Sequence, residues 1–455
     1  MRALLLCLLS IVLLSSSTLA AHDPVVLVKD GKPAATIVVP AEHDHLDFAV
    51  AELNRYLEQA TGARLPVVTD EAKQPQGNLL LLGESTATLA LGLKEADLPS
   101  EGFVIKTFPG KVAIVGDTTH LIDGWYKQKT EGNLWGVYEL LERFLGVRWY
   151  IPGPLGTIVP ETDTAAIPET DLRDHPDFPI RTWWADVDVW PRYSRFKIDL
   201  GLEGREGKLF SLRSRDYNAY GGVQANHSMG YVPRLHHDKP EFFALKSDGK
   251  RALYPPDPDA QKRHGRHWTG YLEYTSDALL KQVIEDHKAY IKGTLPEERL
   301  KLWHAVNSSR APNDFRIAFL PNDGLILSQS EAAKKLYGTS YPERRNGYAS
   351  EYVYKFAHDF AWAMYREFPK MKFVTTAYST YTLPPKTVGK FPPSFIVQIA
   401  VMQPIAMWKE PKIYEEWSGH VRRWHELTGN KVHFWQYACW PKLPKVPFFW
   451  PGLWQ

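Results

Sequence analysis

The sequence is almost free of cysteine. Its 455 residues include only two cysteines, Cys7 and Cys439. Cys7 lies in a leader segment that we expect to be removed, and the single thiol that remains cannot form an internal disulfide, so hydrophobic cores must stabilise the fold. Cys439 stands beside Trp440 without an obvious histidine partner in the sequence, which favours a buried structural thiol over a nucleophile.

An excess of charge is missing too. The formal net charge is +2, and the chain has no run of Lys or Arg, so neither nucleic acid nor an anionic membrane is indicated as a partner. After residue 21, no apolar run approaches the roughly 20 residues that cross a bilayer. The sequence therefore predicts no membrane span.

Motifs that hold metals or cofactors are also absent. The chain has no HExxH motif, and the histidines of 236–238 and 264–267 lie in polar stretches without the spacing of a zinc site. The glycines of 201–207 do not follow a buried strand, as a dinucleotide-binding loop would, and no GxSxG elbow occurs. We expect no metal and no cofactor.

The first 21 residues have the pattern of a secretory signal peptide. Arg2 supplies the positive start, residues 3–14 form an apolar core, and small residues in 15–21 provide a cleavage region. The apolar core is too short to span a bilayer. We therefore expect the mature protein to be secreted or periplasmic.

Aromatic residues are abundant, with 16 Trp and 22 Tyr. In an exported protein such side chains often form flat platforms against sugar rings, although most of them pack in large cores. The composition is thus compatible with a carbohydrate ligand.

Residues 22–155 are predicted to form a small α/β domain. Strand-like runs alternate with two segments of helical apolar spacing, and a hairpin is indicated by Pro109-Gly110. The predicted strands are 24–28, 36–39, 79–82, 103–106 and 112–115, and the predicted helices are 41–60 and 134–144. A Pro-rich, acidic stretch, 156–178, is predicted to be a linker.

Residues 179–455 alternate between strand-like and helix-like segments, which is typical of a parallel sheet wrapped by helices. The predicted strands are 180–185, 220–225, 270–274, 315–320, 372–377, 395–401 and 431–437, and the predicted helices are 276–292, 348–368 and 412–427. We interpret this α/β pattern as a (β/α)8 TIM-type barrel whose eighth strand is expected beyond residue 455.

The segment FRIAFLPNDG, Phe315–Gly324, carries the strongest functional signal. A buried strand stops at Pro321, and Asn322 and Asp323 follow directly. Parallel barrels keep their chemistry at the carboxyl ends of strands. An acid and an amide at that place suit sugar hydrolysis, with Asp323 as the proton donor and Asn322 orienting the substrate. Alternatively, Asp323 only caps an Asp-Gly turn.

Other candidate site residues share a position at or near a predicted strand end. His227 can bind sugar hydroxyls or assist proton transfer, or it can support a loop. Trp435 can stack on a sugar or fill the barrel interior. Glu351, early in a predicted helix, is expected to face the helix dipole instead. The predicted substrate-binding residues are Asn226, His227, Glu273, Tyr378, Trp435 and Tyr437.

Several segments resemble known families. FAVAELNRYLEQATGARLPV and LWGVYELLERFLGVRWYIPGPLGTIVP resemble the accessory α/β domain that precedes the barrel in hexosaminidases and α-glucuronidases. HSMGYVPRL, KPEFFALKSDGKR, FLPNDG and KVHFWQYACW resemble the DUF4838 family, which includes the family 163 glycoside hydrolases, endo-β-N-acetylglucosaminidases that act on complex N-glycans. The resemblance covers nearly all of the mature chain.

The resemblance implies an exported glycoside hydrolase for glycans that contain N-acetylhexosamine. Its mechanism would be retaining, with the acetamide of the substrate as the nucleophile. One alternative is an α-glucuronidase-like inverting hydrolase, which needs a second acid opposite Asp323. Another is a non-catalytic glycan-binding protein, because barrels of this kind host many functions.

Overall fold

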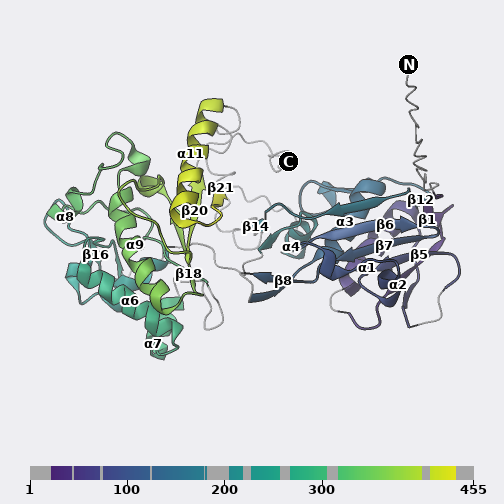
Figure 1. Cartoon of the computed structure of the whole chain (residues 1–455), viewed down its shortest axis with the longest axis horizontal. Coiled ribbons are helices and arrows are strands. Elements are labelled where there is room, and N and C mark those ends of the chain that lie inside the picture. The colour runs from purple at the N-terminus through teal and green to yellow at the C-terminus, as the bar shows by residue number, and fades with distance from the viewer. Residues whose placement is uncertain are drawn as a thin grey trace, which may run out of the picture. The chain divides into compact units, whose positions relative to one another are not determined.

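The protein has the mixed α/β fold that the sequence predicts, and its computed structural model divides into two compact units, residues 1–220 and 221–455 (Figure 1). We refer to these as the N-terminal and the C-terminal unit. The structure describes residues 22–43, 46–71, 75–122, 126–178, 180–181, 204–218, 227–256, 267–304, 316–401 and 410–436.

The N-terminal unit is built on a six-stranded sheet in the order β13-β6-β7-β5-β3-β4. Strands β4, β3, β5 and β7 are parallel, while β6 and β13 join antiparallel. The inner strands are mostly apolar because both faces of the sheet are largely buried. The bounds are β3 (Ala35–Val39), β4 (Val67–Thr69), β5 (Asn78–Leu82), β6 (Phe103–Phe108), β7 (Lys111–Gly116) and β13 (Asp171–Asp174).

Two long helices, α1 (Leu46–Thr61) and α3 (Gly132–Phe144), share a core with one face of this sheet. Helix α3 packs so closely on β7 that a Cβ on Gly136 would lie 2.5 Å from Cγ2 of Ile114. Both helices were predicted from their apolar spacing and are confirmed, although α1 begins at Leu46 rather than at 41. The short α2 (Thr86–Ala90) and η1 (Glu95–Asp97) complete this part.

The stretch 156–178 is not a spacer, in contrast to the prediction. It contains β12 and β13, which pair with β1 and β6 and so complete two sheets of the N-terminal unit. The prolines of this stretch lie outside the two strands, and the acidic residues of β13 lie at a sheet edge. The smaller pairs are β1 (Val25–Lys29) with β2 (Lys32–Pro33) and β12 (Ala165–Ile167), β8 (Thr119–Ile122) with β9 (Tyr126–Lys129), and β10 (Arg148–Trp149) with β11 (Thr157–Ile158), beside η2 (Pro154–Gly156).

The segment predicted as the first barrel strand also belongs to the N-terminal unit. It forms β14 (Ile180–Arg181), which pairs antiparallel with β15 (Tyr217–Asn218) after helix α4 (Gly204–Arg213). The described part of 180–218 therefore continues the first unit, and the division of the chain falls after 220 rather than after 178.

Three arginines of this segment explain why it joins the N-terminal unit, because each forms an ion pair with a glutamate of that unit that is largely shielded from solvent. Arg213 is the most buried of them. Its carbon Cζ lies 5.4 Å from the ring centre of Tyr56. The pairs are Arg181–Glu101 at 2.5 Å, Arg213–Glu52 at 3.0 Å and Arg215–Glu139 at 2.5 Å.

We expect Arg213→Met to destabilise the N-terminal unit by about 3–5 kcal/mol, because the buried Glu52 carboxylate loses its close, buried partner and keeps the partly exposed Arg55 at 3.6 Å. Urea denaturation measures this loss. The matched control is Arg64→Met, which breaks an exposed pair with Glu58 and should cost less than about 1 kcal/mol. Equal effects of the two substitutions would contradict the role given to Arg213.

The C-terminal unit contains a four-stranded parallel sheet in the order β18-β19-β20-β21. Its strands β18 (Arg316–Ala318), β19 (Lys372–Ala377), β20 (Phe395–Val401) and β21 (His433–Gln436) match four of the predicted strands. The predicted helices are confirmed as α6 (Asp277–Ile291), α9 (Ser350–Glu367) and α11 (Pro411–Thr428). No helix within the described ranges is long and apolar enough to cross a membrane.

The two faces of this parallel sheet differ in polarity. Ile317, Phe373 and Val397 lie on the face that shares a core with α9. Alternation along each strand assigns polar residues to the opposite face, where the register places Thr376 beside Gln398 and Gln398 beside His433. The same face also carries Val374 and Ile396, which form a small buried cluster.

A closed barrel does not occur within the described residues. The predicted strand 270–274 is replaced by β17 (Thr269–Gly270), which pairs antiparallel with β16 (Leu253–Tyr254), and the predicted strand 220–225 lies outside the described residues. The remaining elements are short: η3 (Ser228–Gly230), α5 (Tyr231–Leu235), η4 (Pro240–Phe242), α7 (Glu297–His304), α8 (Glu331–Lys334), η5 (Arg345–Gly347) and η6 (Ser379–Tyr381).

A histidine lies in the centre of the C-terminal core. His287 on α6 is 1% exposed, and its ring centre lies 4.8 Å from those of Trp303 and Phe360. Its Nδ1–H donates to the carbonyl of Val283 at 2.8 Å. Burial lowers the pKa of His287 to about 4, so the ring is neutral at pH 7 in the folded protein.

We expect this histidine to make the C-terminal unit sensitive to acid. Its pKa is lower in the folded than in the unfolded chain, so its contribution to stability is complete above about pH 6.5 and is lost as the pH falls toward 4. His287→Phe, which cannot titrate, should therefore lose less stability between these values, by up to roughly 3 kcal/mol. Urea denaturation across this pH range tests the difference, and parallel pH profiles would contradict it.

Candidate functional site

The candidate acid lies on the turn that follows β18. Pro321 has no N–H to continue the sheet, and the chain turns at Asp323-Gly324, where Gly324 has φ +73°. Only glycine adopts that conformation without strain. The turn leaves the side chain of Asp323 69% exposed, so the carboxylate is open to a ligand.

The backbone that carries this turn is hydrogen-bonded on both sides. On one side the N–H of Phe319 donates to the carbonyl of Val374 at 2.8 Å, which extends the pairing with β19. On the other side the N–H of Leu320 donates to Oγ of Ser228 at 2.9 Å, and the N–H of Met229 donates to the carbonyl of Leu320 at 3.0 Å. The start of η3 therefore lies against the end of β18.

This arrangement brings His227 and Asp323 together, as the sequence predicts. Nδ1 of His227 lies 2.8 Å from the carbonyl oxygen of Pro321. A carbonyl only accepts, so Nδ1 carries a proton and donates it. Nε2 then faces the carboxylate, with 3.9 Å to Oδ1 of Asp323. This distance exceeds a hydrogen bond, and a small movement or a bound hydroxyl can close it.

Tyr378 lies next to this pair, directly after β19. Its ring centre is 6.2 Å from that of His227. The following residue, Ser379, has φ +52°, a left-handed conformation that is uncommon outside glycine and is often found where function requires it. The nearby Tyr381 is 1% exposed, and its hydroxyl has no hydrogen-bond partner within the described part of the chain.

Asn322 holds the turn to the neighbouring hairpin. Its Nδ2 donates a short hydrogen bond to the carbonyl of Gly270 at the end of β17. One of the two N–H groups of this amide is thus engaged within the protein. The second N–H group and the amide oxygen remain for a substrate.

The two spare carboxylates identified in the sequence are both buried. Glu273 is 5% exposed and accepts hydrogen bonds from the hydroxyls of Ser328 and Thr275. Glu351 is 2% exposed and accepts from Ser340, Thr387 and two backbone N–H groups. Burial alone would raise the pKa of Glu351, but these hydrogen bonds lower it below its ordinary value. These contacts give both residues a role inside the fold, in contrast to the substrate contact predicted for Glu273.

The remaining predicted site residues divide into two groups. Trp435 on β21 pairs with Ala400 and shares the polar face of the sheet with His433. Burial above all, with Arg316 nearby, lowers the pKa of His433 to about 4. Asn226 and Tyr437 lie outside the described residues. No group of metal-ligating residues occurs among the residues that the structure describes.

Sequence reasoning missed Ser228 and Tyr271. Ser228 is 1% exposed and contacts the strand end through its hydroxyl, and Tyr271 lies against Gly324. Both are distant from Asp323 in sequence, so only the fold reveals them. The signal that could have pointed to Ser228 was its place directly after His227.

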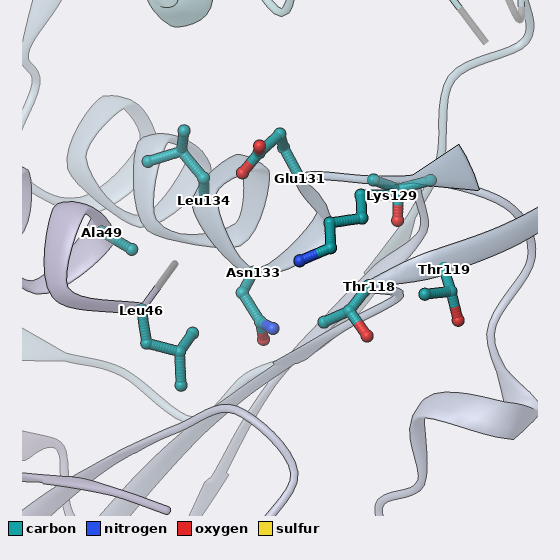
Figure 2. Close-up of a pocket in the computed structure, with 9 residues that line it drawn as sticks. Leu46, Ala49, Thr118, Thr119, Lys129, Glu131, Asn133 and Leu134 are labelled. Atoms are coloured by element: carbon teal, nitrogen blue, oxygen red, sulfur yellow. The ribbon is translucent and has the colours of Figure 1, made fainter. Parts of the chain in front are cut away.

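The N-terminal unit contains a cavity of about 70 Å³ beside the start of α3 (Figure 2). It is much smaller than the several hundred Å³ of a typical ligand pocket, and it belongs to a different unit from Asp323. We therefore assign no ligand to it. Its lining residues are Leu46, Ala49, Thr118, Thr119, Lys129, Thr130, Glu131, Asn133 and Leu134.

No protein-family profile matches the sequence, and no curated protein is similar to it in sequence. Solved structures with partial similarity include the N-acetyl-β-hexosaminidase of Streptomyces plicatus, with 12% identity, TM-score 0.32 and coverage of 91% of this chain and 71% of that one. The GH20 β-N-acetylhexosaminidase of Streptomyces coelicolor A3(2) has 12% identity, TM-score 0.35 and coverage of 91% and 72%.

A third similar structure is the GH115 4-O-methyl-α-glucuronidase BtGH115A, with 13% identity, TM-score 0.37 and coverage of 90% of this chain and 54% of that one. Identities and scores this low do not establish a relationship. The assignment of function must therefore come from the residues of the site.

We expect Ser228→Ala to destabilise the C-terminal unit by about 1–3 kcal/mol, because the buried N–H of Leu320 loses its acceptor. It should also shift the imidazole NMR signals of His227. The control is Ser350→Ala, an equally buried serine that donates to Leu383 at 2.7 Å. This control should lower stability and leave the His227 signals unchanged. Unchanged His227 signals in both variants would contradict the positioning role of Ser228.

Proposed function

We propose that the protein is a glycoside hydrolase that cleaves glycans containing N-acetylhexosamine, with Asp323 as the general acid. The observation that carries this proposal is the pairing of an exposed Asp323 with His227 at 3.9 Å, on a turn directly after a parallel strand. Carboxyl ends of parallel strands are where α/β folds hold their ligands. The resemblance of FLPNDG and its neighbouring segments to family 163 hydrolases supports the same substrate class.

In the proposed mechanism the protonated Asp323 gives its proton to the glycosidic oxygen as the bond from that oxygen to the anomeric carbon breaks. The carbonyl oxygen of the substrate's own acetamide bonds to the anomeric carbon from the opposite side and forms a cyclic intermediate. Water then attacks the same carbon, its proton returns to Asp323, and the ring opens. Two inversions give overall retention.

The side chains around Asp323 can support these steps. Nε2 of His227 can hold a sugar hydroxyl or exchange a proton with the carboxyl group. The oxygen of Asn322 can accept the N–H of the acetamide. A sugar seated over the turn would displace water, and loss of water favours the protonated, donating form of a carboxyl group.

The contacts of the other carboxylates favour this scheme over an inverting one. An inverting hydrolase needs a second carboxylate that activates water across the sugar ring. Within the described ranges, Glu273 and Glu351 are buried and engaged by internal donors, so we assign this role to neither of them. The predicted signal peptide supports the further proposal that the protein acts after export.

Asp323→Asn should lower the rate of glycan release by about 10²–10⁴, the usual contribution of a general acid. Release from a glycoprotein with complex N-glycans is followed by mass spectrometry, and the first-formed anomer is identified by NMR. Asp359→Asn, which changes a partly exposed acid on α9, is the control and should leave the rate unaltered.

Full activity of Asp323→Asn would show that another residue is the general acid. A product with inverted configuration would contradict the acetamide mechanism. Absence of release by the unaltered protein, together with measurable glycan binding, would show a glycan-binding protein instead. Absence of both glycan release and glycan binding would contradict the proposed substrate class.

A further inference from the structure

Two tyrosines lie on the side of the Asp323-Gly324 turn that faces the β16–β17 hairpin. The hydroxyl of Tyr271 lies 3.4 Å from the point that a Cβ of Gly324 would occupy. The ring of Tyr254 meets that of Tyr271 edge-on, with 6.4 Å between ring centres and 84° between planes. We refer to these two edge-on rings, of which Tyr271 lies against Gly324, as the aromatic strip.

The backbone beneath this strip is held firmly. The N–H of Tyr271 donates to the carbonyl of Ala252 at 2.9 Å, and its carbonyl accepts from Ala244 at 2.8 Å. Asn322 adds the bond from its amide to Gly270, which joins the hairpin to the catalytic turn. Aromatic groups on such a fixed hairpin lose little conformational freedom when a ligand binds.

Exposure separates these tyrosines from the aromatic core of the same unit. Tyr254 is 37% exposed, whereas Tyr352 and Tyr354 are fully buried. Tyr271 is half-buried, and burial, Tyr254 and the charge of Asp323 together raise its pKa. Its phenol is therefore protonated at neutral pH and can donate a hydrogen bond close to Asp323.

The charge around the strip points to an uncharged ligand. Nζ of Lys246 lies 5.9 Å from the ring centre of Tyr254, and the same ammonium group is 3.0 Å from the carboxylate of Asp248. The two opposite charges offset each other, so Tyr254 does not present a net cation to an acidic sugar.

We propose that Tyr254 and Tyr271 form a binding subsite for a neutral sugar ring of the glycan, adjoining the bond that Asp323 cleaves. The apolar C–H face of the sugar stacks on Tyr254, and the hydroxyl of Tyr271 donates to a sugar hydroxyl. This subsite rests on the proposed function, because it assigns part of the same glycan to a place beside Asp323.

The test measures binding apart from catalysis. A complex N-glycan is titrated by calorimetry into the full mature chain carrying Asp323→Asn, so that the ligand is not consumed. Adding Tyr254→Ala should weaken binding about tenfold, as expected for loss of an aromatic contact. Adding Tyr271→Phe, which keeps the ring and removes the hydroxyl, should weaken it about fivefold.

The matched control is Tyr414→Ala, which removes a tyrosine on α11 that is 53% exposed and should leave binding unchanged. Binding by the parent that survives both Tyr254→Ala and Tyr271→Phe would overturn the subsite and leave the proposed function standing. Equal weakening by Tyr414→Ala would also overturn it. A parent that binds no glycan would overturn the proposed function and the subsite together.

Discussion

The candidate site depends on three residues that follow β18, Phe319–Pro321, and whose backbone is hydrogen-bonded on both sides. The sheet holds Phe319 through Val374, and the hydroxyl of Ser228 and the N–H of Met229 hold Leu320. These bonds leave no freedom to the backbone that leads into Asp323. They also draw His227 beside the acid, because the residue before Ser228 must lie alongside Pro321. One set of backbone hydrogen bonds thus places both candidate site residues.

Ion pairs between residues far apart in the chain join 180–218 to the N-terminal unit. The sequence did not reveal the end of this unit, because such pairs leave no local pattern. Periodicity predicts an element from its neighbours, whereas the pair of Arg213 with Glu52 joins residues far apart in the chain. The linker predicted for 156–178 was inferred from the proline and acidic residues of that stretch alone. The strands β12 and β13 lie between those prolines, and β13 carries its acidic residues at a sheet edge, where a strand pairs on one side only.

The elements that sequence reasoning predicted well are those whose apolar pattern decides their packing. The helices α6, α9 and α11 and the parallel strands β18 to β21 follow this rule. The prediction for 270–274 was wrong because a short apolar run does not specify its partner, and Gly270 pairs with Leu253 instead of joining the parallel sheet. In the same way Asp323 and His227 were foreseen from strand ends, whereas Ser228 and Tyr271 depend on which loops the fold brings together.

The contrast between the carboxylates supports the proposed role of Asp323 as the general acid. A carboxylate surrounded by donors, such as Glu351, is stabilised as an anion, and protonating it would break the hydrogen bonds that hold its loop. Such a group stabilises a fold but cannot exchange a proton in each catalytic cycle without structural cost. Asp323 is 69% exposed, and Nε2 of His227 lies 3.9 Å from its carboxylate. Its carboxylate faces solvent on a backbone that is hydrogen-bonded on both sides, and this is the placement that we propose for the general acid.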